Sequence, residues 1–159
     1  MSDPSRRGFL TNAAATVPIA GIVLLAESAS AGDAPESRRV IEGSPSPNFS
    51  RAVGIGRLVY ASGVLGVRPG SWEVVSPDFE PQCRQALENL KASVEAAKSS
   101  MDRVLKCTCF LTEAADFAAM NKVYQTFFPK DPPARSTVVV KELVAKGAKF
   151  EIDCVTSLP

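Results

Sequence analysis

Alternating and β-branched stretches predict six strands in this chain. Residues 50–53 and 58–64 flank Gly54-Ile55-Gly56-Arg57, whose two glycines allow the positive φ of a tight turn, so this segment predicts a β-hairpin. A third short strand is predicted over residues 72–75, after a turn. The other three strands are predicted at residues 103–112, 135–140 and 149–155.

Apolar residues at spacings of three and four predict two amphipathic helices. Asp78 can cap the first, which runs to about Ala97 and carries an apolar stripe of Cys83, Leu87, Leu90 and Val94. The second spans residues 115–128, and its Phe117, Met120, Tyr124 and Phe127 are interpreted as core residues. Because right-handed crossovers bring both helices to the same side, the order βββαβαββ predicts an α+β fold with two helices on one face of a mixed sheet.

Composition narrows the classes of function. The 159 residues suffice for one domain, and the 45% hydrophobic and 22% charged balance is that of an ordinary globular protein. Eighteen basic residues against 17 acidic ones give a net charge of +1, which offers no electrostatic case for nucleic-acid binding. Histidine is absent, so catalysis has to use carboxylates, arginine, hydroxyls, thiols or the backbone.

The four cysteines do not predict a metal centre. Cys107 and Cys109 share one face of a strand with Leu105 and Leu111, which predicts burial, and they lack the Cys-x2-Cys spacing of zinc knuckles. No cofactor motif occurs elsewhere, so we expect neither a metal nor a cofactor. The return from the first helix brings Cys109 back toward Cys83, and the sequence therefore allows a disulfide between them in an oxidising compartment.

The N-terminus has the pattern of a twin-arginine export signal. Arg6-Arg7 precede an apolar run from Ala13 to Ala26 and the small-residue site Ala29-Ser30-Ala31, so residues 1–31 are predicted to be a signal peptide that directs the protein to the periplasm. An uncleaved membrane anchor is the alternative, although such a run forms a helix of only about 21 Å against a hydrocarbon core of ~30 Å. After cleavage we expect no stable membrane association.

The polar stretch at residues 32–47 is predicted to be a linker to a domain at residues 48–159. Within that domain Arg135 stands at the start of a stiff strand. A guanidinium held in this way matches a carboxylate with two parallel hydrogen bonds, so a small carboxylic acid is its simplest ligand. A solvated surface ion pair is the alternative for a single arginine.

Several segments resemble, in the right order, the reactive intermediate deaminase family, also called YjgF-like. They are ALENLKASVEAA, DFAAMNKVYQTFF, PPARSTVVV and KFEIDCV, and the resemblance covers about residues 45–158. It implies a fold like that of a bacterial chorismate mutase, assembled as a homotrimer around a barrel. It also implies hydrolysis of enamines and imines, such as 2-aminoacrylate, to 2-keto acids and ammonia without a cofactor.

The resemblance also implies the site residues. Arg135 matches the arginine that grips the substrate carboxylate, and Glu151 matches the acid that positions or activates water. Gly63 matches a backbone contact, and Asn121 matches a residue near the site. In the sheet order of the family Glu151 lies near Gly63, whereas Arg135 begins its strand at the opposite end, so we expect a complete site to borrow Arg135 from a neighbouring subunit.

Three positions depart from the pattern of deaminating members. Phe49 stands where many have tyrosine, Val64 where glutamine is common, and Thr137 where cysteine is frequent. Phe49 and Thr137 are nevertheless candidate substrate-binding residues. A lost hydroxyl removes an orienting hydrogen bond or a proton relay, so these positions bear on the substrate and the rate.

Three functions are consistent with this sequence. The first is an exported imine or enamine deaminase, which the intact Arg135 and Glu151 favour. The second is a small-carboxylate-binding or protective protein of the same fold, which Phe49 and Val64 favour. The third is a redox-responsive holdase that acts through exposed thiols.

The export signal gives the first testable prediction. Changing Arg6 and Arg7 together to lysine should trap the precursor in the cytoplasm, because the twin-arginine pathway reads the arginine pair. Cell fractionation with detection of the cleaved form, expected to begin at Gly32, measures this. Normal export of the double variant would remove the twin-arginine assignment.

Overall fold

A computed structural model describes residues 36–44 and 46–159 of the chain, and the predicted signal peptide lies outside them. Its core is a six-stranded sheet of order β1-β2-β3-β6-β4-β5. The strands are β1 (Arg39–Ile41), β2 (Ala52–Ile55), β3 (Leu58–Leu65), β4 (Val104–Leu111), β5 (Ala134–Val139) and β6 (Phe150–Ser157). The helices are α1 (Phe79–Ala96) and α2 (Phe117–Phe127), with short 3-10 turns at Met101–Arg103 and Ala114–Asp116.

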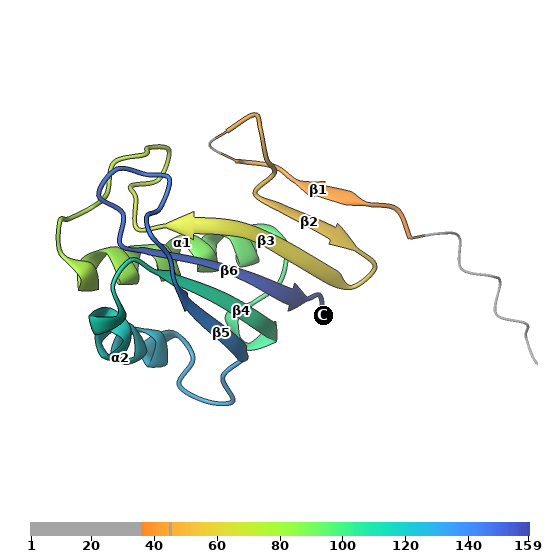
Figure 1. Cartoon of the computed structure of the whole chain (residues 1–159). Helices are drawn as coiled ribbons and strands as arrows, with labels where there is room; N and C mark the ends of the chain where they lie inside the picture. The colour runs from red at the N-terminus through yellow and green to blue at the C-terminus, as the bar shows by residue number, and fades with distance from the viewer. Residues whose placement is uncertain (1–35, 45) are drawn as a thin grey trace, which may run out of the picture. The chain divides into compact units, whose positions relative to one another are not determined.

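The last strand of the chain lies in the middle of the sheet. In Figure 1 the dark-blue β6 runs between the yellow β3 and the green β4, and it is antiparallel to both. β4 and β5 are parallel, as expected for strands joined through a helix. The mixed sheet confirms the α+β fold predicted from the sequence.

One hydrophobic core joins the two helices to a single face of the sheet. Phe150, Ile152 and Cys154 alternate along β6 toward α1, and Phe79 at the start of α1 meets Phe150 edge to face at 6.1 Å between ring centroids. The predicted α1 stripe is fully buried: Cys83, Leu87, Leu90 and Val94 are each 0% exposed. The alternate residues of β6 therefore face away from the helices, on a side we call the open face.

A buried glutamine ties the start of α1 to the loop before β6. The Gln82 amide donates to the backbone oxygens of Ser76 and Gly147 at 2.8 and 2.9 Å, and its oxygen accepts from the Lys149 backbone nitrogen at 2.8 Å. Its side chain is fully buried, and each of these hydrogen bonds offsets the cost of removing the amide from water.

Two short segments differ from their predicted form. Residues 39–41 form β1 inside the stretch predicted to be a linker, because Val40 and Ile41 pair with Val53 and Ala52 of the hairpin. The third strand predicted at residues 72–75 is wrong, since only an isolated bridge joins Val67 to Val74 there. Both differences depend on which segments pair with each other as strands, and local propensity does not specify that pairing.

The start of β4 also departs from the predicted alternation. Val104 is buried and Leu105 is 49% exposed, whereas Cys107, Cys109 and Leu111 are buried as predicted. The register against β6 shifts between Val104 and Lys106, and such a bulge reverses which residues face the core. The prediction that Leu105 is a core residue is therefore wrong.

All four thiols are free and buried, so the disulfide between Cys83 and Cys109 that the sequence allows is not formed. Burial raises the pKa of Cys107 to about 11 and that of Cys109 to about 12. Both are therefore protonated at neutral pH and shielded from solvent, which removes the exposed thiols that the holdase reading requires. Within the described residues, no helix is long and apolar enough to cross a membrane.

Candidate functional site

Arg135 lies at the start of β5, on the face that α2 covers. Its Cα pairs with that of buried Cys107, and its Nη2 donates a 2.8 Å hydrogen bond to Oδ1 of Asn121 on α2. The strand pairing fixes the backbone of Arg135, and the Asn121 amide fixes the position of its guanidinium. Asn121 and Arg135, which the resemblance assigns to one site, are thus in direct contact.

Two aromatic rings of α2 hold the same guanidinium. Arg135 Cζ lies 4.6 Å from the Tyr124 ring centroid and 5.7 Å from that of Phe117. Contacts of this kind stabilise a cation by about 0.5–2 kcal/mol, depending on its desolvation. The prediction that both rings are core residues is correct for Tyr124 and wrong for Phe117, which is 45% exposed.

The Tyr124 phenol stays neutral beside the cation. Burial raises the pKa of Tyr124 well above its ordinary value, and its hydroxyl approaches the Cys107 thiol without the geometry of a hydrogen bond. Among the described residues it has no hydrogen-bond partner. Its ring face thus contributes to the site, and its hydroxyl remains an unused donor.

The spacing of these two rings in the sequence indicates a site, although both rings are interpreted from the sequence as core residues. Phe117, Asn121 and Tyr124 are four and three residues apart, which places them on one side of α2. An amide between two aromatics on one helix face is an unusual core pattern. Together with Arg135 these residues form what we call the arginine cluster.

Glu151 lies on the open face of β6, over Gly63. The Glu151 carboxylate occupies the space that a Cβ at Gly63 would fill, so the absence of a side chain there allows this close approach. The pairing of β3 with β6 shifts register between Ala61 and Val64, and this irregularity places Gly63 there. The expected proximity of Gly63 and Glu151 is confirmed, and we call them the Gly63–Glu151 pair.

Partial burial raises the pKa of Glu151 above its ordinary 4.5, and the nearby Asp153 carboxylate raises it further. On the β4 side Glu151 pairs with Phe110, whose side chain therefore lies on the same face. A carboxylate with a raised pKa accepts a proton more readily, which suits general acid–base chemistry.

A single protomer does not bring the arginine cluster and the Gly63–Glu151 pair together. Arg135 pairs with Cys107 and Glu151 pairs with Phe110, three residues further along β4, a distance of about 10 Å. β5 and β6 flank β4 on opposite sides, which adds about 10 Å across the sheet. The two side chains also point to opposite faces.

The other candidate residues lie around these two groups. Thr137 pairs with buried Cys109, so it follows Arg135 on the same face of β5. Phe49 is 40% exposed and lines a cavity that also contacts Gly63 and Val64. In the part of the chain that the structure describes, no cluster of three or more His, Cys, Asp or Glu side chains could hold a metal ion.

Known proteins resemble this chain over the described domain. The family described as Endoribonuclease L-PSP matches residues 42–158. Reactive Intermediate Deaminase A of Arabidopsis thaliana is 38% identical over 110 residues, which are 69% of this chain and 58% of that protein. The 2-iminobutanoate/2-iminopropanoate deaminase of Dermatophagoides farinae is 40% identical over 107 residues, which are 67% of this chain and 83% of that one.

The chain belongs to the reactive intermediate deaminase family. A crystal structure of E. coli TdcF with bound serine superposes with a TM-score of 0.69 at 36% identity, and the match covers 76% of this chain and 99% of that one. The family match at residues 42–158 thus includes both helices and strands β2 to β6.

The raised pKa of Glu151 leads to a prediction about stability. The folded state favours the protonated carboxyl, so this group stabilises the fold below pH about 4 and loses that contribution as pH rises through the folded-state pKa. Glu151→Gln should therefore unfold at a higher temperature than the wild type at pH 7, and the difference should shrink at pH 4.

Thermal unfolding followed by circular dichroism at both pH values measures this difference. Glu113→Gln is the matched control, because Glu113 is exposed. An equal shift for Glu151→Gln at both pH values would show that its carboxyl is not perturbed by folding.

Proposed function

We propose that this protein hydrolyses reactive imines and enamines of the 2-aminoacrylate class to 2-keto acids and ammonia. The observation that carries the proposal is a half-buried carboxylate of raised pKa, Glu151, held over the bare backbone of Gly63. Relatives at about 40% identity that are named as deaminases support it. Arg135 supplies the carboxylate clamp that such substrates need.

The chemistry requires only water and a group that moves protons. An enamine first takes a proton at carbon and becomes an imine. Glu151 then accepts a proton from a water molecule as its oxygen attacks the imine carbon, and returns a proton to nitrogen. A proton then passes from the hydroxyl group of the resulting carbinolamine through Glu151 to the amino group. The carbon–nitrogen bond breaks, ammonia leaves, and the oxygen of water remains as the keto group.

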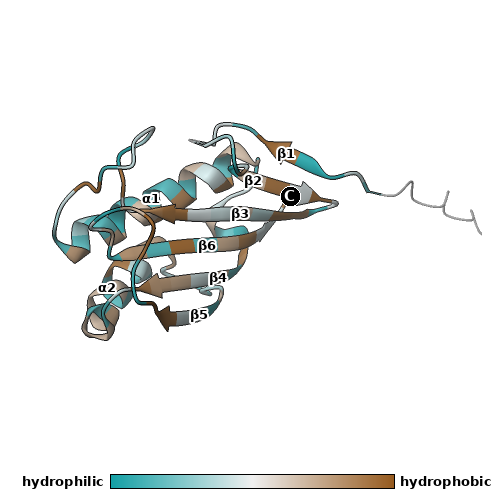
Figure 2. Cartoon of the chain, turned by 45° about the horizontal axis from the view of Figure 1, so that its top comes forward, coloured by the Kyte–Doolittle hydropathy of each residue, from teal (hydrophilic) through white to brown (hydrophobic). Residues whose placement is uncertain are grey.

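We propose that the complete site forms between subunits of a homotrimer. The arginine cluster and the Gly63–Glu151 pair lie too far apart in one protomer, on opposite faces, to hold one small molecule. Exposed apolar side chains on the sheet support assembly: Leu58 and Tyr60 on β3, and Val138 near the end of β5, whose apolar tip is brown in Figure 2.

A binding protein without turnover is the second candidate function. Phe49 has no hydroxyl and Val64 has no amide beside the Gly63–Glu151 pair, so two polar groups that would orient water are missing. In either case we propose that the ligand is a small imino or keto acid. From the order of the N-terminal motifs we also propose export through the twin-arginine pathway.

Arg135→Ala should abolish turnover and carboxylate binding while the fold persists. Two charge-assisted hydrogen bonds contribute about 1.5–3 kcal/mol each, so their loss should weaken recognition by roughly two to four powers of ten. Arg135→Lys should recover little, because an ammonium cannot reproduce the planar fork. An active enzyme consumes freshly generated 2-aminoacrylate before it forms a semicarbazone. The decrease in semicarbazone formed therefore measures turnover.

Two further variants complete this test. Arg84→Ala, an exposed arginine on α1, is the matched control and should leave turnover unchanged. Glu151→Gln should slow turnover but spare binding of a small keto acid, and this result separates the enzyme from the binding protein. Near-normal carboxylate affinity in Arg135→Ala would contradict the central role of Arg135.

Complementation tests the shared site directly. In a closed trimer made from Arg135→Ala and Glu151→Gln chains, every mixed ring contains one site with both native residues. Random mixing at equal amounts should therefore restore about a quarter of wild-type activity. Each variant alone should be much less active than the mixture, and sedimentation equilibrium should give three protomers. No recovery from a mixture of proven hybrid trimers would place both residues in one subunit.

A further inference from the structure

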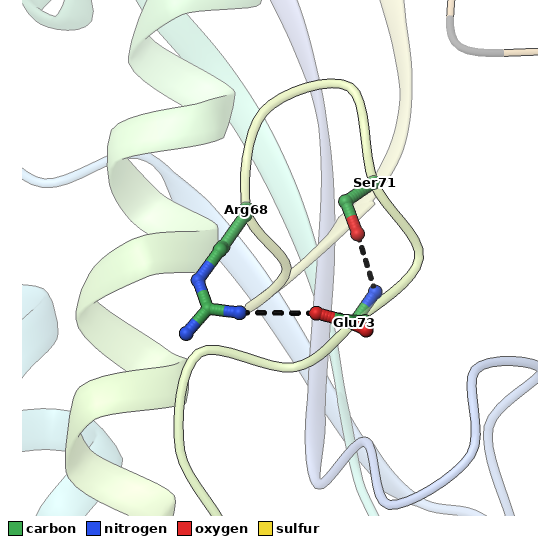
Figure 3. Close-up of polar contacts among 3 residues, drawn as sticks. All are labelled: Arg68, Ser71 and Glu73. Carbon is green, nitrogen blue, oxygen red and sulfur yellow. Dashed lines mark hydrogen bonds and ion pairs between the residues drawn. The ribbon is translucent and has the colours of Figure 1, made fainter.

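Reactive side chains outside the candidate site differ in whether they already have a partner. In the exposed loop after β3, Arg68 Nη1 lies 3.1 Å from Glu73 Oε2, and the Ser71 hydroxyl accepts a 2.9 Å hydrogen bond from the Glu73 backbone nitrogen (Figure 3). The two charges of this loop therefore offset each other. The four buried thiols are different, because no part of the proposed chemistry uses them.

Two of these thiols stand directly opposite each other in the middle of the sheet. Cys107 on β4 pairs with Cys154 on β6 in antiparallel register. Both side chains belong to the core beneath the helices, and they are 0% and 2% exposed. They therefore project from neighbouring strands toward the same side of the sheet.

The hydrogen-bond pattern of the two strands brings this pair close together. The Thr112 backbone nitrogen donates to Lys149 O at 3.2 Å, one position beyond the last pair of the ladder. Thr112 and Lys149 are thus a hydrogen-bonded pair, and such pairs alternate with non-hydrogen-bonded pairs along antiparallel strands. The register is unbroken from there back to Cys107, five positions away, so Cys107 and Cys154 form a non-hydrogen-bonded pair.

A non-hydrogen-bonded pair has the separation that a disulfide requires. Its Cα atoms lie about 4.5 Å apart, and its side chains are closer than those of a hydrogen-bonded pair. Disulfides span Cα separations of about 4.4–6.8 Å. The sulfurs of Cys107 and Cys154 can therefore join without a change of strand register.

The other two thiols are placed less favourably. Cys109 follows Cys107 on the same face of β4, and two such residues lie roughly 7 Å apart, beyond the ~4 Å Cβ separation of a disulfide. Cys83 belongs to α1, in the layer that covers the sheet, so strand register does not place it opposite another thiol. Cys83 with Cys109 is the competing pair, because the sequence allows a disulfide between them.

Cys107 is the thiol of the opposed pair that ionises more readily. Burial raises the pKa of Cys107 to about 11 and that of Cys154 to about 12. The Tyr124 hydroxyl and the cations of Lys106 and Arg135 lower the pKa of Cys107, whereas the groups that act on Cys154 all raise its pKa. Because the thiolate is the attacking species in disulfide exchange, Cys107 reacts first.

We propose that Cys107 and Cys154 form a cross-strand disulfide under oxidising conditions, which ties β4 to the central strand β6. The bond does not depend on the proposed deaminase activity, because none of that chemistry uses a thiol. It joins the strand that carries Glu151 to the strand that pairs with β5 at Arg135, so it fixes the spacing between the strands on which both candidate residues depend.

The oxidant in this reaction is a low-molecular-weight disulfide. The Cys107 thiolate attacks one of its sulfurs, which forms a mixed disulfide and releases one small thiol. The Cys154 thiolate then attacks the Cys107 sulfur, which forms the protein disulfide and releases the second small thiol. Two cysteine protons pass to the released thiols, and two electrons reduce the small disulfide. Because both cysteines are shielded in the folded protein, the first exchange takes place before β6 docks.

Oxidative refolding tests the proposed bond. The full-length protein is unfolded and reduced, and then refolded in mixtures of 2-hydroxyethyl disulfide and 2-mercaptoethanol, which reach the thiols before β6 docks. Alkylation in denaturant followed by mass spectrometry should show that the number of free thiols falls from four to two. Fragmentation of the cross-linked peptides should place the bond between Cys107 and Cys154. Four free thiols in every mixture, or a bond at Cys109, would overturn the proposal.

Two double variants identify the pair independently. Cys83→Ala/Cys109→Ala retains the proposed pair and should lose both thiols in the same refolding mixture. Cys107→Ala/Cys154→Ala is the matched control, which retains the competing pair and should keep both thiols. The opposite result would assign the bond to Cys83 and Cys109 and contradict the proposal. Circular dichroism checks that each variant folds, and the fragmentation of the wild-type protein decides the assignment if one does not.

The stability of the oxidised protein provides a second measurement. A bond between Cys107 and Cys154 restricts a long loop of the unfolded chain, so the oxidised protein should unfold at a higher temperature than the reduced protein. Dithiothreitol should return both the unfolding temperature and the number of free thiols to those of the reduced protein. An unfolding temperature that is unchanged or lower after oxidation would show that the bond does not fit the native strand pair.

Discussion

β6 lies in the centre of the sheet, and its two-residue period divides its residues between the core and the open face. Phe150, Ile152 and Cys154 pack under α1. Glu151, one position away, is left on the other side with Gly63 and Phe110 as its neighbours. A slip of one residue would exchange these two sets, so the burial of Phe150 is also what positions the carboxylate.

The same division between the two faces of the sheet explains why the candidate catalytic residues lie in two separate groups. Arg135 is oriented from the helix side by Asn121, Phe117 and Tyr124, whereas Glu151 lies on the open side in the space left by the absence of a Cβ at Gly63. Arg135 is thus preorganised by its own neighbours. Orientation that is complete before a ligand arrives is what binding and catalysis by charged groups require.

Periodicity was sufficient for the parts of the fold in which one face meets the core. It placed the hairpin, the stripe of α1 and the buried thiols of β4 correctly. It failed at Leu105, where a bulge changes which residues of β4 face the core. It also failed at residues 39–41, a polar segment that forms a strand because it pairs with β2. Arg135 and Glu151 came from motif resemblance, and their separation in one protomer follows from the strand order, which no local pattern encodes.

The strand order has a consequence for how the chain reaches its folded state. β3 and β4 do not pair with each other, and only β6, the last strand to leave the ribosome, joins them. Without β6 no backbone pairing joins β1-β2-β3 to β4-β5. Formation of the complete sheet therefore depends on contacts between residues distant in sequence, which slows folding.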